Sequence, residues 1–208
     1  MSRFVLVPAV AAAATAALAI VLGVALGHGG DARSAKDGDY RGSRPPPGLH
    51  LPAFALRDYR GALVASKELR GKAIAITFLD SQCTDACPVI ARQLAAARKL
   101  LSPGERARIA AYAITVDPSE DTPAAVRRFL RRQRGERALG YLLGSTRALR
   151  PVWNAFQILP SLDTGEDDVH SAPVRIYDRD GVWVSTLHPG ADLTPRNLAH
   201  DLHTALSD

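Results

Sequence analysis

The feature that most constrains this chain is a pair of continuous apolar segments, each of strand length. Residues 73–79 read AIAITFL, and residues 109–116 read IAAYAITV. A continuous apolar run, rather than an alternating one, is typical of a strand that is buried on both faces. Sheets with two buried faces are covered by helices, so these two segments predict an α/β fold.

A helix is predicted after each of these strands. After the first, apolar residues recur at helical spacing from Cys87 to Leu101, and Pro88 suits a first turn. After the second, Thr122 and Pro123 provide an N-cap and a proline at the first helical position. The order strand, helix, strand, helix is typical of neighbouring parallel strands.

Shorter patterns complete the predicted fold. Strands are expected at residues 51–56, 62–65, 141–143, 173–177 and 182–187, and helices at residues 146–157 and from residue 195 onward. Between the last two strands, Asp-Arg-Asp-Gly at residues 178–181 predicts a hairpin turn. A hairpin adds antiparallel strands to a parallel core. The prediction is therefore an α/β fold with a mixed sheet flanked by helices.

The N-terminal segment, residues 1–27, carries a long apolar run from Phe4 to Leu26. As a helix this run would span roughly 35 Å, enough to cross a bilayer core about 30 Å thick. An uncleaved transmembrane anchor is the favoured prediction, and a cleaved signal peptide is the alternative. Both place the rest of the chain outside the cytoplasm, where the environment is oxidising. The expected location is therefore the cell membrane, with the folded domain on its extracytoplasmic side.

Two regions follow this segment. Residues 28–50 are rich in Gly, Asp, Arg and Pro and lack apolar periodicity, so they predict a flexible linker. Residues 51–208 contain the strand and helix patterns and predict a single domain. The whole chain of 208 residues has two cysteines, too few for a four-cysteine zinc or iron–sulfur site. A net charge of +5 without a nucleic-acid-binding motif gives no reason to expect a nucleic-acid partner.

The residues most suited to chemistry lie in the segment SQCTDACP, residues 81–88, between the first buried strand and its helix. Functional sites usually form at the carboxyl ends of strands in open α/β sheets. Cys83 in the loop and Cys87 in the first helical turn are expected to converge, and the helix N-terminus is expected to favour thiolates. The alternative is a structural disulfide. Closing so short a loop contributes only about 2 kcal/mol, which is little for a domain of this size.

Three short motifs follow one another in the domain. Residues 83–88 (CTDACP) follow the first buried strand, residues 115–123 (TVDPSEDTP) follow the second, and His170 and Ser171 precede the hairpin. Together they resemble the Sco/SenC family of thioredoxin-like, copper-binding cytochrome c oxidase assembly proteins. The chain departs from the family pattern at Thr84, where proline is more frequent, at Asp80-Ser81 in place of Tyr-Thr, and at Pro173.

By this resemblance, the metal ligands are Cys83, Cys87 and His170, and the fold is thioredoxin-like. The donor chemistry agrees, because two soft thiolates suit Cu(I) and an added imidazole serves both Cu(I) and Cu(II). The resemblance implies a membrane-tethered copper chaperone that delivers copper to the binuclear copper site of cytochrome c oxidase during assembly. Its expected partners are the copper-site subunit of the oxidase and another extracytoplasmic copper carrier or thiol reductase.

A second function stays open. The redox pair Cys83 and Cys87 would also serve a thiol–disulfide oxidoreductase that keeps the partner's copper-site cysteines reduced. The CxxxC spacing differs from the CxxC of thioredoxin-type enzymes, and simple thiol exchange has no need of His170. Both features favour copper.

Other polar clusters have simpler interpretations. His200 and His203 lie three apart in the last helix and are expected at the surface, because no third ligand accompanies them. Acidic residues between positions 163 and 168 predict a solvated loop. Arginines between positions 127 and 134 predict a solvated helix face, with docking to an acidic protein or to lipid headgroups as the alternative. Asp117 and Asp121 are expected to cap and shape the turn that precedes this helix.

Overall fold

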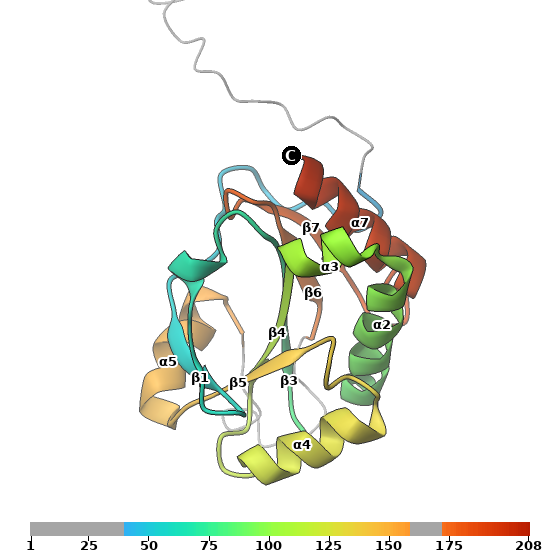
Figure 1. Cartoon of the computed structure of the whole chain (residues 1–208). Helices are drawn as coiled ribbons and strands as arrows, with labels where there is room; N and C mark the ends of the chain where they lie inside the picture. Colours follow the sequence, from blue (N-terminus) through green and yellow to red (C-terminus); the bar gives the residue numbers. More distant parts are fainter. Residues whose placement is uncertain (1–39, 159–171) are drawn as a thin grey trace, which may run out of the picture. The chain divides into compact units, whose positions relative to one another are not determined.

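A seven-stranded mixed sheet forms the centre of the protein, in a computed structural model that describes residues 40–158 and 172–208. Its strands lie in the order β2-β1-β5-β4-β3-β6-β7 (Figure 1). The strands are β1 (Ala55–Asp58), β2 (Leu63–Ala65), β3 (Ala73–Leu79), β4 (Ile109–Thr115), β5 (Gly140–Leu143), β6 (Val174–Tyr177) and β7 (Trp183–Leu187). Strands β3, β4 and β5 are parallel to one another, and every other pairing is antiparallel. The predicted mixed α/β sheet is confirmed.

Helices cover both faces of this sheet. They are α2 (Ala86–Leu100), α3 (Pro103–Arg108), α4 (Pro123–Arg132), α5 (Thr146–Ala155) and α7 (Pro195–Ser207). The buried residues of α2, α4 and α7 share one core, and those of α5 belong to a second core. Figure 1 shows the same division, with α5 on one side of the sheet and α2 and α7 on the other.

Strand β3 separates the two cores. All seven of its residues are buried. Side chains alternate along a strand, so Ala73 and Ala75 face the core of α2 and α7, whereas Ile74 and Ile76 face the core of α5. This double burial explains why the strand is apolar throughout, and it fixes the position of the loop that follows Leu79.

The first strand differs from its prediction. The sequence pattern placed it at residues 51–56, but β1 begins at Ala55. Leu51 N donates to the Gly181 carbonyl at 2.8 Å, so the start of the predicted segment contacts the turn between β6 and β7. Phe54 continues the register of β1 with β2, because Ser66 N donates to its carbonyl at 3.0 Å, but Phe54 N donates to the Ser66 side-chain oxygen Oγ at 3.2 Å.

Residues 40–43, which fall within the predicted linker, are hydrogen-bonded to the domain. Arg41 N and Gly42 N donate to the Asp201 carboxylate at 2.7 and 3.0 Å. Ser43 N donates to the Thr186 carbonyl at 2.8 Å. A Cβ atom added at Gly42 would lie 2.5 Å from that carbonyl oxygen, so this close approach to β7 requires glycine. The segment is thereby fastened to β7 and α7.

The apolar run Phe4–Leu26 lies outside the described residues, so its expected role as an anchor stays a prediction. Within residues 40–158 and 172–208, the helices are all too short or too polar to cross a bilayer.

Candidate metal centre

The two cysteines lie together at the carboxyl end of β3. Cys83 is partly exposed in the loop, and Cys87 is fully buried in the first turn of α2. Both are thiols in this structure, and a hydrogen bond joins them. The convergence of the two sulfur atoms, expected from the strand–loop–helix pattern, is therefore confirmed. One sulfur is open to a partner, while the other is enclosed by the core.

The protonation of Cys87 differs from the expectation that the helix N-terminus favours a thiolate. The hydrogen bond with Cys83 and burial both raise the pKa of the Cys87 thiol far above its ordinary value. Both causes oppose a negative charge in this enclosed position, and they outweigh the helix terminus. Cys87 is accordingly a neutral thiol in this arrangement, and a soft cation that binds its sulfur must displace the proton.

Asp80, the residue directly after β3, holds the backbone of the cysteine loop through hydrogen bonds. Its carboxylate accepts a hydrogen bond from Gln82 N at 2.7 Å and another from the backbone of Cys83. The residue is only 5% exposed, and burial raises the pKa of its carboxyl group to about 6. Asp80 thus fixes the backbone on which the partly exposed thiol stands.

A second buried carboxylate, Asp121, ties this loop to the neighbouring strands. It accepts hydrogen bonds from Ser81 N at 2.9 Å, from Thr115 Oγ1 at 2.6 Å and from Tyr141 Oη at 2.7 Å. Burial raises the pKa of Asp121, although each of these hydrogen bonds lowers it. Burial also raises the pKa of the Tyr141 phenol, so this group stays protonated and donates. Asp121 therefore joins the cysteine loop to β4 and β5.

The turn before α4 follows its predicted outline. Asp117 accepts hydrogen bonds from Ser119 N at 3.0 Å and Glu120 N at 3.3 Å, which shapes the turn as expected. The cap of α4 is Thr122, whose side chain accepts from Ala125 N. Asp121 itself points away from the helix end toward the cysteine loop, a role that goes beyond the predicted one.

The histidines fall into two groups. His170, the predicted third ligand, lies outside the described residues, as do the acidic residues between 163 and 168. His200 and His203 do not share a site: His200 Nδ1 lies 3.2 Å from Asp201, and His203 Nδ1 lies 2.6 Å from Glu105. Over residues 40–158 and 172–208, no three His, Cys, Asp or Glu side chains are grouped to hold a metal.

The sequence analysis missed the supporting roles of Asp80 and Tyr141. For Asp80 a signal was present, because an acidic residue directly after a fully apolar strand stands at the sheet edge where sites form. For Tyr141 the sequence carries no such signal. Its hydroxyl donates to the Leu79 carbonyl at 2.8 Å across 62 residues of chain.

Sequence comparisons relate this chain to one family of known proteins. The SCO1/SenC family profile matches residues 44–207. An SCO2-like protein of Rickettsia felis is 26% identical over 151 residues, covering 70% of this chain and 71% of that protein. The mitochondrial SCO2 homologue of Bos taurus is 27% identical over 136 residues, covering 62% of this chain and 50% of that protein.

Solved structures show the same fold. The structure of Bradyrhizobium japonicum ScoI with copper bound has a TM-score of 0.62 at 27% identity, covering 76% of this chain and 99% of that one. Yeast Sco1 with copper bound has a TM-score of 0.59 at 25% identity, covering 73% and 85%. Apo Sco1 of Thermus thermophilus, at 23% identity, has a TM-score of 0.65 and covers 79% and 96%. The predicted thioredoxin-like Sco fold is confirmed.

Proposed function

Because the chain belongs to the SCO1/SenC family, we propose that it binds copper through Cys83, Cys87 and His170 and delivers it to the binuclear copper site of cytochrome c oxidase. The observation that carries this proposal is the hydrogen-bonded pair of thiols at the carboxyl end of β3. Two thiolates are the donors that Cu(I) prefers, and this pair is already within reach of a single ion.

Copper is the cargo of this site, so release matters as much as binding. Three ligands leave a position open, whereas a permanent structural site of the zinc type has four. The partly exposed Cys83 is the thiol that a partner's ligand reaches first, and the buried Cys87 is the one released last. This asymmetry favours stepwise transfer to an acceptor, for which the copper-site subunit of the oxidase is the proposed protein.

The site's location is part of the same proposal. The run Phe4–Leu26 would anchor the protein in the cell membrane and leave the copper domain on the extracytoplasmic side. Recovery of the full-length protein in carbonate-washed membranes, with residues 51–208 open to external protease, is the expected result. A soluble form that starts near residue 28 would instead indicate a cleaved signal peptide.

The ligand set is tested on the reduced full-length protein by measuring Cu(I) and Cu(II) stoichiometry. The wild type is expected to bind one Cu(I), and Cys83→Ser or Cys87→Ser is expected to abolish this binding. His170→Ala is expected to weaken Cu(II) more than Cu(I), because two thiolates alone hold Cu(I) linearly. His200→Ala is the matched control, since this histidine contacts Asp201 on α7. Equal Cu(II) binding by the His170 and His200 variants would remove His170 from the site.

A thiol–disulfide oxidoreductase is the second candidate, and the unequal exposure of the two thiols favours it. An accessible thiol beside a buried one is the arrangement of a nucleophile and its resolving partner. The same His170→Ala variant separates the two functions in cells at low copper. Loss of oxidase assembly, rescued by added copper, supports the chaperone. Normal assembly with His170→Ala but not with Cys83→Ser would replace copper delivery by thiol exchange.

A further inference from the structure

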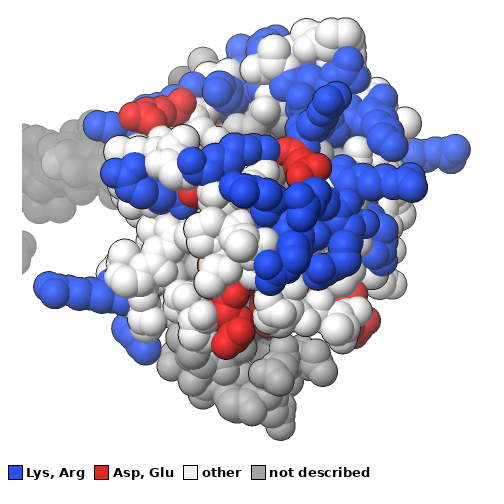
Figure 2. Space-filling view, turned by 60° about the horizontal axis from the view of Figure 1, so that its bottom comes forward, with Lys and Arg blue, Asp and Glu red and all other residues white. Residues whose placement is uncertain are grey.

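A basic groove lies on the face formed by the C-terminal parts of α2, α3 and α4, and we propose that it binds a linear phosphate-bearing anion such as short-chain inorganic polyphosphate. This activity is separate from copper binding. Figure 2 shows lysine and arginine side chains gathered over this face. The groove has a volume of about 600 Å³, and its cationic lining residues are Arg98, Lys99, Arg106, Arg131, Arg134 and Arg137.

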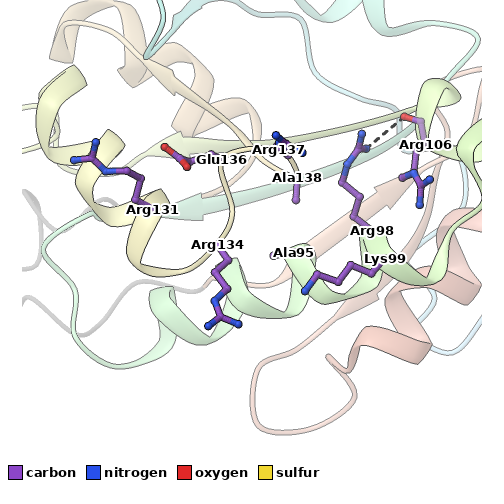
Figure 3. Close-up of a pocket in the computed structure, with 9 residues that line it drawn as sticks. All are labelled: Ala95, Arg98, Lys99, Arg106, Arg131, Arg134, Glu136, Arg137 and Ala138. Carbon is purple, nitrogen blue, oxygen red and sulfur yellow. Dashed lines mark hydrogen bonds between the residues drawn. The ribbon is translucent and has the colours of Figure 1, made fainter.

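The cations come from α2, α3, α4 and the connection that follows α4, and all of them line one hollow, although Figure 3 shows the Arg131 and Arg134 side chains extending outward from it. Arg98 and Lys99 end α2, Arg106 lies in α3, and Arg131 lies in the last turn of α4. Within the described residues that line the groove, Glu136 is the sole carboxylate. The excess of positive charge is therefore a property of the tertiary fold.

Arg134 departs from its predicted place on the α4 face. It follows the end of the helix in a left-handed conformation, with φ of 56°. This turn separates Arg134 from the exposed face that carries Arg127 and Arg128 and places it among the groove residues. The arginine-rich segment is thus divided between a solvated helix face, as predicted, and a wall of the groove.

Two of the guanidinium groups are held in place by the backbone. Arg106 Nη1 donates to the Leu101 carbonyl at 2.7 Å, and Arg98 Nη1 donates to the Arg106 carbonyl at 3.4 Å. Each guanidinium keeps further N–H donors, because arginine carries five. Arginines that are already oriented lose less side-chain entropy when they bind an anion.

The shape and the lining favour phosphate over other anions. A planar guanidinium pairs with phosphate oxygens through two parallel hydrogen bonds. A groove lined by several arginines can form such a pair with more than one phosphate group. The described lining residues include no aromatic ring, so the groove has no platform on which a nucleobase would stack. The headgroups of a flat lipid surface would contact the outer edge of this groove but not the cations deeper inside it.

The groove is longer than a single phosphate requires. A second hollow of about 260 Å³ shares Arg98, Arg106 and Arg137 with it and continues to Arg60 and Lys72. Unlike the first, this second hollow also has Asp58 and Tyr112 in its lining, so the excess of positive charge is greatest in the first. Cations that line two adjoining hollows fit a chain of linked phosphate groups better than one compact ion. The ligand class is therefore a linear polyphosphate.

The groove and the thiols lie toward opposite ends of α2. Cys87 is in the first turn of this helix and Arg98 in the last, which places their backbones roughly 16 Å apart at 1.5 Å per residue. The basic residues at the helix C-termini also stabilise the helix dipoles. That structural role does not extend to Arg137, which lies in the connection between α4 and β5.

The test is calorimetric titration of the metal-free full-length protein with inorganic tripolyphosphate at physiological salt. The wild type is expected to bind one tripolyphosphate, and Arg131→Gln/Arg137→Gln is expected to weaken binding about tenfold through the loss of two guanidinium contacts. The matched control is Arg127→Gln/Arg128→Gln, which removes the same charge from α4 outside the groove. The control is expected to bind as the wild type does, and Cu(I) stoichiometry is expected to be equal in all three proteins.

Several results would overturn this proposal. Equal weakening by both double variants would show attraction to net charge alone. Equally tight binding of tetraglutamate would show that the groove does not select phosphate. Binding to phosphatidylglycerol vesicles without binding of tripolyphosphate would assign the face to a membrane surface. If Arg131→Gln/Arg137→Gln is unfolded by circular dichroism, Lys99→Gln replaces it, and unchanged tripolyphosphate affinity in that variant would also contradict the proposal.

Discussion

Two buried aspartates, Asp121 and Asp201, use the same chemistry in two regions of the molecule. Their exposed fractions are 4% and 0%. Asp121 accepts a backbone N–H from the cysteine loop, and Asp201 accepts two from residues 41 and 42. Asp201 also accepts the Ser185 hydroxyl at 2.6 Å. In both regions, a buried carboxylate holds a segment that is distant in sequence.

The difference between the two lies in their donors and surroundings. Asp121 accepts hydrogen bonds from the side chains of Ser81, Thr115 and Tyr141 and from the backbone N–H of Ser81, and burial raises the pKa of its carboxyl group. The backbone donors to Asp201 are only part-buried. The buried carboxylate of Asp121 therefore lies beside the candidate copper loop at a cost in stability. The carboxylate of Asp201 instead fastens a surface segment to the domain. We infer that the first serves the geometry of the thiols and the second the integrity of the domain.

The largest expected effect is that of Asp121→Ala. It leaves the donors of Ser81 and Thr115 unpaired and the Tyr141 hydroxyl with the Leu79 carbonyl as its remaining acceptor, which is expected to lower the free energy of unfolding by about 3–4 kcal/mol. The released cysteine loop is also expected to weaken Cu(I) retention in competition with a chelator. Urea denaturation and chelator competition measure the two effects. Full stability and full copper retention would show that the network does not position the thiols.

Asp201→Ala is expected to have a smaller effect, about 2–3 kcal/mol, because water reaches the freed amides of residues 41 and 42. Hydrogen exchange of those amides is expected to accelerate, while Cu(I) stoichiometry and affinity stay unchanged. Exchange mass spectrometry and copper titration of one preparation are the measurements. A copper defect equal to that of Asp121→Ala would remove the distinction between the two regions.

Tyr141→Phe refines the comparison within the first region. It removes one hydroxyl that donates to both Asp121 and the Leu79 carbonyl, with an expected loss of about 1–2 kcal/mol. The ring stays in place, so packing against Phe129 is retained. Chemical denaturation measures the loss, with Tyr112→Phe on β4 as the control variant. If both variants lose the same stability, the Tyr141 hydrogen bonds carry no special weight.

The last expected effect concerns the dependence of stability on pH. The pKa of Asp80 is raised to about 6 in the folded protein, from an ordinary value of 3.8. The folded state therefore binds the proton more tightly, and the stability linked to this group is lost as pH rises from about 4 to above 6. Asp80→Asn is expected to remove this loss, so its stability relative to the wild type rises across that range. Parallel denaturation profiles from acid to neutral pH would contradict the assignment.

Local sequence patterns predict the parts of this fold whose residues specify them locally. The run AIAITFL needs no distant partner to be identified as a buried strand, and Thr122-Pro123 marks the start of α4 by itself. Helix α3 was not predicted, because its six residues bury no side chain and so show no apolar periodicity. A local signal was nevertheless present, since Ser102 and Glu105 form a capping box around Pro103.

For the candidate site, too, the sequence predicts the local geometry but not the properties that depend on long-range contacts. The CxxxC segment at a strand–helix junction brings the two thiols together through local geometry alone. Their protonation depends on the enclosure of Cys87 by the core, which no short segment specifies. The contact between Ser81 and Asp121 spans 40 residues and exists only when β3 and β4 pair in their observed register. Long-range hydrogen bonds of this kind follow from the assembled sheet.

The two faces of β3 place different limits on the size of side chains that can be substituted there. Toward α2 and α7 the strand presents Ala73 and Ala75, which leave no room for growth. Toward α5 it presents Ile74 and Ile76, which have volume to lose. Enlarging an alanine forces the layers apart at about 1–3 kcal/mol, whereas trimming an isoleucine to valine costs about 0.5–1.5 kcal/mol. Divergent descendants of this chain are therefore expected to keep small residues at positions 73 and 75 of β3, while Leu79 on the same face and the residues on the opposite face exchange with other aliphatic residues.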